Sequence, residues 1–283
     1  MKKSFTKKAF RIKLVTTAVT VLALAALSLT ACGAKKDTSD DKTIKFAVTN
    51  LKVYEDTTKV LASEVEKLGY KLDYKLLADD VQINEAVESG EYFANYHQHT
   101  PYMDEFNKTH NGHLAAAFKV FTDRSGIFSK KYKSLDELPD GAQITIPNDA
   151  GNNFRPLLIL ADAGLITLKE GVEPINVTTN DIVDNPKHLK FIEVDYTMLA
   201  KSLEEADAGF LYATVAAEID LDFNKDVLAA EKPEFSAADI IAVREENLGS
   251  EKAKILEQAY KSDAVKKALS DSYDGREILE PAW

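Results

Sequence analysis

The chain has 283 residues, a formal net charge of −11 and one cysteine. Such an acidic chain is poorly suited to bind nucleic acid or anionic lipid headgroups through its surface charge. A single cysteine rules out a disulfide within the chain, so a hydrophobic core must stabilise the folded part, which is long enough for one large or two medium domains.

The N-terminus has the pattern of a lipoprotein signal peptide. Six basic residues precede an uncharged apolar stretch of 18 residues from Leu14 to Ala31, and the sequence LTAC ends at Cys32. This stretch could also form a short transmembrane helix, but the basic start and the small residues before the cysteine favour export and cleavage. We predict that residues 1–31 are removed, that Cys32 is lipidated, and that residues 32–42 form a flexible tether. The mature chain, with 29 basic and 46 acidic residues, then lies on the extracytoplasmic face of the cell membrane.

From Thr43 onwards, short apolar runs alternate with amphipathic segments. Strands are predicted at 43–50, 71–77 and 92–99, with helices at 56–69 and 81–90 between them. This alternation is typical of a parallel sheet that is covered by helices.

A second series of the same kind follows, and it predicts a second parallel α/β unit. Its strands and helices are expected at 143–149, 155–165, 189–195, 196–206 and 208–214. One more strand is expected at 239–247, followed by a helical segment at 250–273. We therefore predict two lobes, with residues 43–133 as the first part of lobe 1, 134–237 as lobe 2, and 238–283 as the segment that returns to lobe 1.

Two histidines stand one residue apart in the stretch ANYHQHTPY, residues 94–102. In a strand, His97 and His99 point to the same face, and they lie at its carboxyl end, where open α/β sheets bind ligands. The pair could bind a metal, but zinc needs three or four protein ligands, and the remaining candidates, among them Asp80, form no motif. We interpret the stretch as the wall of a pocket, with a metal site or ordinary surface or core histidines as the alternatives.

The stretch IPNDAGNNFRPLLIL, residues 146–160, leads from a strand into a helix that starts near Arg155. Free backbone N–H groups and a guanidinium converge there, which suits an anion and above all a carboxylate. The alternative is that Arg155 pairs with an acidic residue of the protein itself. Neither a nucleophile elbow nor a metalloprotease or phosphate-loop motif is present, and there is no catalytic thiol, so we do not expect an enzyme or a cofactor.

Several stretches resemble the NlpA-type methionine-binding lipoproteins, which deliver their substrate to an ABC importer. They include VQIN (81–84), ANYHQHTPY (94–102), GIFSKKYKSLDELPDGAQITIPND (126–149) and NNFRPLL (152–158), and the likeness spans about residues 43–280. The resemblance implies a two-lobed periplasmic-binding-protein fold, type 2-like, in which two α/β lobes are joined by a hinge with the ligand cleft between them. It also implies an ABC permease and its ATPase as partners.

The resemblance further implies a set of ligand-binding positions. Arg155 would hold the carboxylate of the substrate with help from Asn152, and Thr214 would give hydrogen-bonding support. His97, His99 and Tyr102 would surround the side chain and the amino group.

The sequence departs from the family pattern at some of these positions. Asp80 and His97 stand where the family usually has Tyr and Phe, Phe154 replaces a glycine, and Tyr212 to Val215 replace the family's N-T-N-Y. Two polar groups would then lie where a thioether should be buried, at a cost of about 1–3 kcal/mol for each unpaired group. We therefore expect the ligand to be methionine or, more in keeping with these changes, a polar or cationic amino acid or a short peptide. The alternative function is a zinc-type metal-capturing lipoprotein that uses Asp80, His97 and His99.

Overall fold

The computed structural model describes residues 42–233, 236–273 and 278–283. The predicted signal peptide, Cys32 and all of the tether except its last residue therefore lie outside the described residues. Within the described part of the chain, no helix is both long and apolar enough to cross a membrane.

The first sheet has five strands in the order β2-β1-β3-β13-β4. Strands β1 (Thr43–Thr49), β2 (Lys71–Leu77) and β3 (Ala94–His99) are parallel, as the sequence predicted. The other two strands, β13 (Asp239–Arg244) and β4 (Leu114–Lys119), run antiparallel to their neighbours. The sheet is therefore mixed, because β13 runs opposite to the three predicted parallel strands.

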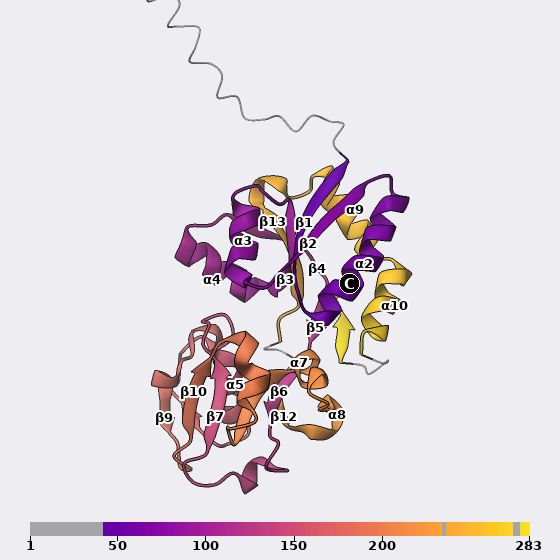
Figure 1. The fold of residues 1–283 in the computed structure, drawn as a ribbon. Helices are drawn as coiled ribbons and strands as arrows, with labels where there is room; N and C mark the ends of the chain where they lie inside the picture. Colours follow the sequence, from indigo (N-terminus) through magenta and orange to yellow (C-terminus); the bar gives the residue numbers. More distant parts are fainter. Residues whose placement is uncertain (1–41, 234–235, 274–277) are drawn as a thin grey trace, which may run out of the picture. The chain divides into compact units, whose positions relative to one another are not determined.

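Helices cover both faces of this sheet (Figure 1). On one face lie α3 (Asp80–Glu88) and α4 (Thr100–His110), and on the other α2 (Lys52–Lys67), α9 (Glu251–Tyr260) and α10 (Asp263–Asp271). The predicted helical segment 250–273 is two helices, because the Ser262 side chain accepts a hydrogen bond from the backbone N–H of Val265 and so begins a new helix.

The second sheet has the order β10-β7-β11-β6-β12. Strands β7 (Gln143–Pro147), β10 (Lys190–Val194) and β11 (Ala208–Tyr212) are parallel, while β6 (Ser125–Phe128) and β12 (Val227–Ala230) form an antiparallel edge. A two-stranded pair, β8 (Thr167–Leu168) and β9 (Ile182–Asp184), accompanies it. The helices of this part are α5 (Phe154–Asp162), α6 (Leu199–Ser202), α7 (Ala213–Glu218) and α8 (Phe223–Asp226).

Strands in the middle of both sheets are buried on both faces. Phe46, Ala47 and Val48 of β1 have no exposed surface, and Ile144, Thr145 and Ile146 of β7 are at most 2% exposed. Continuous burial of this kind is typical of strands that helices cover on both sides. The polar positions that remain are therefore concentrated where the strands end.

Two chain segments connect the sheets, and they are hydrogen-bonded to each other. The N–H of Val120 donates to the carbonyl of Asp239 at 2.8 Å, and the N–H of Glu231 donates to the carbonyl of Ser125 at 2.8 Å. Strand β5 (Phe121–Asp123) lies on the first of these segments and pairs with β14 (Leu279–Pro281). The two segments are where a hinge between the sheets would bend.

The strand assignments bear on the predicted lobe boundaries. The sequence placed Ser125–Phe128 in lobe 1, but this strand, β6, belongs to the second sheet. The return near residue 237 falls between the end of β12 and the start of β13. We propose that the first boundary lies just before Ser125 and the second between Ala230 and Asp239.

Candidate functional site

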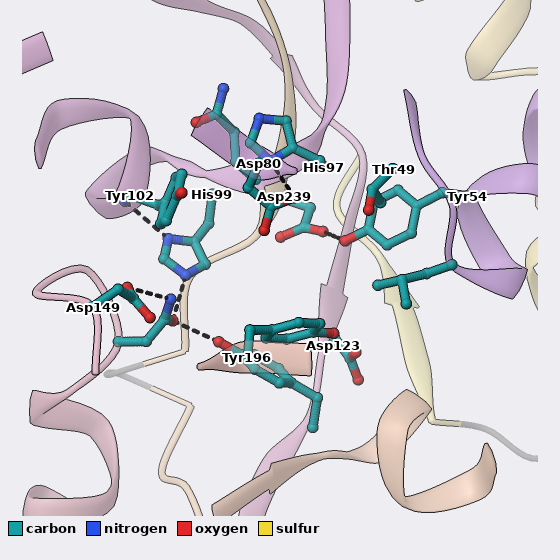
Figure 2. Close-up of a pocket in the computed structure, with 14 residues that line it drawn as sticks. Thr49, Tyr54, Asp80, His97, His99, Tyr102, Asp123, Asp149, Tyr196 and Asp239 are labelled. Atoms are coloured by element: carbon teal, nitrogen blue, oxygen red, sulfur yellow. Dashed lines mark hydrogen bonds and ion pairs between the residues drawn. The ribbon is translucent and has the colours of Figure 1, made fainter. Parts of the chain in front are cut away.

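A cavity of about 60 Å³ lies where strands of both sheets end (Figure 2). One water molecule needs roughly 10–15 Å³ of such space, so the cavity suits a small solute. The lining residues are Thr49, Leu51, Tyr54, Asp80, His97, Gln98, His99, Tyr102, Asp123, Asp149, Asn152, Tyr196, Tyr212 and Asp239.

The two histidines of β3 both line the cavity, as predicted, but they have different partners. The Nδ1 atom of His97 lies 3.4 Å from Oδ1 of Asp80, and its Nε2 lies 3.1 Å from Oδ1 of Asn84. The ring of Tyr102 stands edge-on to the His97 ring, with 5.8 Å between their centroids. His97 therefore contacts groups of α3 and α4, the helices that cover one face of the first sheet.

His99 instead reaches across to the second sheet. Its Nε2–H donates to Oδ1 of Asn152 at 2.7 Å, and its Nδ1 accepts from the backbone N–H of Tyr102 at 3.3 Å, which caps helix α4. Burial, and then the nearby Arg155 guanidinium, lower the pKa of His99 to about 3. The imidazole is therefore neutral at physiological pH, in the tautomer that these two hydrogen bonds require.

Asn152 joins several of these groups. Besides the bond from His99, its Oδ1 accepts from the Tyr212 hydroxyl at 2.5 Å and from Nη1 of Arg155 at 3.3 Å. Its Nδ2 donates to Oδ1 of Asp149 at 2.9 Å. The side chain is buried, so both ends of its amide are fixed by hydrogen bonds and its orientation is set.

Arg155 is buried beside the cavity rather than in its wall. Its Nε and Nη2 donate to the two carboxylate oxygens of Glu231 at 2.7 and 2.6 Å. Nη2 also donates to Oγ of Ser125 at 3.0 Å. The guanidinium thus pairs with an acidic residue of the protein itself, which is the alternative that the sequence left open.

Two carboxyl groups in the wall are buried together with a hydroxyl partner. Asp123 accepts hydrogen bonds from the hydroxyl and the backbone N–H of Thr214, and Asp239 accepts one from the hydroxyl of Tyr54. Burial raises the pKa of Asp123 to about 8, although the bonds from Thr214 oppose this shift, and it raises the pKa of Asp239 to about 6. Burial also raises the pKa of Asp149. None of the described residues that line the cavity is Lys or Arg, so an ionised carboxylate there has no cationic partner of these types in the wall.

Five of the seven predicted ligand-binding residues line the cavity, namely Asp80, His97, His99, Tyr102 and Asn152. The other two, Arg155 and Thr214, lie behind it and contact lining residues, Arg155 through Asn152 and Thr214 through Asp123. Among the described residues, no group of three or more His, Cys, Asp or Glu side chains is arranged to hold a metal ion.

Sequence reasoning missed nine lining residues. Five of them, Thr49, Leu51, Asp149, Tyr196 and Tyr212, stand at the end of a parallel strand or within two residues after it. The general rule that ligands bind beyond the carboxyl ends of strands would have found these five. Asp123 and Asp239 lie on the connecting segments, so finding them required knowledge of where the chain crosses between the sheets.

Comparison with known proteins agrees with this geometry. The profile of the NlpA lipoprotein family matches residues 44–283. The chain belongs to the NlpA lipoprotein family. It is 38% identical over 256 residues to the D-methionine-binding lipoprotein MetQ of Escherichia coli K12, an alignment that covers 89% of this chain and 93% of that protein. It is 35% identical to the methionine-binding lipoprotein MetQ of Bacillus subtilis, over 87% of this chain and 92% of that protein.

A solved structure gives the same result for the fold. A nutrient-binding protein from Burkholderia cenocepacia, bound to methionine, superposes with a TM-score of 0.79 at 33% identity and covers 85% of this chain and all of that one. The two-lobed fold predicted from the resemblance is thereby confirmed.

In this NlpA lipoprotein, the departures from the family pattern fall into two groups. Asp80, His97 and Tyr212 line the cavity, so these three changes alter the surface that a ligand would meet. Phe154 is buried in the core, and Thr214 lies behind Asp123. Only the first group therefore lies at the cavity.

Proposed function

We propose that this protein is the solute-binding lipoprotein of an ABC importer and that it holds an amino acid or a short peptide in the cavity between the two sheets. The observation that carries the proposal is the position of the cavity. Polar side chains from the strand ends of both sheets meet there, in a chain whose family includes methionine-binding lipoproteins. In this proposal Asp80, His97, His99, Tyr102 and Asn152 contact the solute.

The remaining steps of transport follow from the same fold. A solute that touches both sheets favours the closed arrangement of a hinged protein, because it gains contacts only when both sides are present. The closed protein would then deliver the solute to the permease, while a lipid on Cys32 keeps it at the extracytoplasmic face of the membrane. The strongly acidic composition of the chain is compatible with this role, because the role requires no anionic binding partner.

The identity of the solute is tested on the full-length protein purified in detergent. Mass spectrometry of small molecules that co-purify with it is expected to find an amino-acid-like compound. Calorimetric titration with methionine, histidine, arginine and dipeptides then ranks the candidates. If no compound of this class binds at millimolar concentration, the proposal is wrong.

The metal-capturing alternative has weaker support. The ring nitrogens of His97 and His99 face amide groups, a backbone N–H and one carboxylate, and both Asn152 and Asn84 are poor substitutes for zinc ligands. The alternative predicts that a chelator lowers the melting temperature and that zinc restores it. The solute-binding proposal predicts no response to either reagent.

A further inference from the structure

We propose that the cavity favours a small organic cation, an amine or guanidinium compound without a carboxylate, over the amino acid that has the same side chain. This inference rests on the proposed function, because it names the class of solute that the same site takes. The reason is that Glu231 already fills the place where a substrate carboxylate would bind Arg155.

The contacts of Arg155 leave little capacity for a second carboxylate. A guanidinium has five N–H groups, and four of them donate to Glu231, Ser125 and Asn152. The Glu231 pair is bidentate, which is the strongest geometry available between these groups. Both side chains are almost completely buried, with 2% of Arg155 and 1% of Glu231 exposed.

The position of Glu231 explains why this pair forms within the chain itself. Glu231 directly follows strand β12, on the segment that leads back to the first sheet. Its backbone N–H donates to the carbonyl of Ser125, the same residue whose hydroxyl accepts from Arg155 and donates to the Glu231 carboxylate at 2.9 Å. The carboxylate is therefore held in place at the backbone and at the side chain.

Tyr212 lies between this pair and the solute. Its ring lies over the guanidinium, with 5.0 Å from Cζ of Arg155 to the ring centroid, and Tyr212 itself lines the cavity while Arg155 does not. A solute in the cavity would meet the phenol ring rather than the guanidinium. The charge of Arg155 is thus compensated by Glu231 and covered by Tyr212.

The wall that the solute does meet is acidic. It includes Asp80, Asp123, Asp149 and Asp239, whereas none of the described residues that line the cavity is Lys or Arg (Figure 2). A solute carboxylate would be repelled by these groups, while an ammonium or guanidinium would supply the counter-charge that they lack. The rings of Tyr54, Tyr196 and Tyr212 also offer faces that attract cations.

The test compares amino acids with the amines that lack only their carboxylate. The pairs are methionine with 3-(methylthio)propylamine, arginine with agmatine, and lysine with cadaverine, titrated calorimetrically into the full-length protein in detergent. Because the amine avoids the repulsion between a carboxylate and the acidic wall, we expect at least one amine to bind roughly tenfold or more tightly than its amino acid. If every amino acid binds as tightly as its amine or more tightly, Glu231 does not exclude the carboxylate and the inference is overturned.

A variant tests the cause of this preference. Glu231→Gln keeps the shape of the side chain and removes its charge, which leaves the positive charge of Arg155 uncompensated beside the cavity. The preference for the amine should then shrink by about tenfold or reverse. Glu204→Gln is the matched control, because Glu204 pairs with Lys130 on the surface, before the start of β11 and away from its Tyr212 end. This variant should keep the preference of the parent.

The outcomes separate the two proposals. If neither member of any pair binds, the proposed function fails together with this inference. If amino acids bind and amines do not, the proposed function stands and the inference fails. An unchanged preference in a folded Glu231→Gln protein would overturn the role of Glu231, and the comparison within the parent protein decides the solute class even if that variant does not fold.

Discussion

The ionisation of Asp123 predicts an unusual loss of stability at alkaline pH. Its folded-state pKa of about 8 is raised by burial far above the value of 3.8 for an exposed carboxyl. The folded protein therefore holds a proton that the unfolded chain has lost, and the stability that this proton provides disappears as the pH rises towards and through 8. Between pH 7 and pH 9 the free energy of unfolding should fall by about 1.4 kcal/mol from this group.

The interval from pH 7 to pH 9 brackets the pKa of Asp123. The pKa of Asp239, about 6, lies below this interval, so Asp239 is already ionised in both states. The pKa of His99, about 3 in the folded protein, also lies far below it. Because burial also raises the pKa of Asp149, comparison with a variant at position 123 assigns the fall to Asp123.

Urea unfolding of the solute-free protein at pH 7, 8 and 9 measures this effect. Asp123→Asn should remove the fall, because an amide keeps an acceptor for Thr214 and does not ionise. Asp271→Asn on the surface of α10, where Asp271 pairs with Lys267, is a control with the same change of charge. If the parent and Asp123→Asn lose stability in parallel over this interval, Asp123 is not held protonated and the reasoning is refuted.

Three further predictions concern the same site. Asn152→Ala removes the acceptor that His99 and Tyr212 share. It should lower the free energy of unfolding by about 1–3 kcal/mol in urea unfolding and weaken solute binding in calorimetry. An unchanged affinity would show that Asn152 does not belong to the site. Glu231→Gln leaves the buried Arg155 guanidinium with only part of its partners and should lower the free energy of unfolding by about 3 kcal/mol. The surface variant Glu204→Gln should lower it by less than about 1 kcal/mol. Equal effects of the two variants in urea unfolding would contradict a stabilising buried pair. The affinity for an amine should rise between pH 5 and pH 9 as Asp239 and then Asp123 ionise, and a flat calorimetric pH profile would show that these carboxylates do not face the bound cation.

Much of the fold could be predicted because its signals are local. The strand expected at 71–77 is found there, and those expected at 143–149 and 208–214 are found at Gln143–Pro147 and Ala208–Tyr212, since each is a short run bounded by polar or turn residues. The antiparallel strands of both sheets were harder to predict. The direction in which β13 pairs depends on where the chain returns to the first sheet, and no local pattern carries that information.

The site shows the same division between local and distant signals. His97, His99, Tyr102 and Asn152 were predicted because short motifs contain them, and the structure brings these residues together at one cavity. Glu231 was not predicted, because it lies 76 residues from Arg155 in the sequence and stands in a segment without any recognisable motif. A contact between residues so far apart in the chain is fixed by the tertiary structure alone.

The pair of Arg155 and Glu231 also explains how the arginine could be kept while the ligand changed. A buried guanidinium without a partner costs several kcal/mol, and replacing it would also break its bonds to Ser125 and Asn152. If a solute supplies the carboxylate, the arginine is paired only in the complex. If the protein supplies it through Glu231, the arginine is paired at all times and continues to orient Asn152, and the solute no longer needs a carboxylate. An acidic wall is then an advantage, because the charge that remains to be matched in the cavity is negative, and a cation matches it.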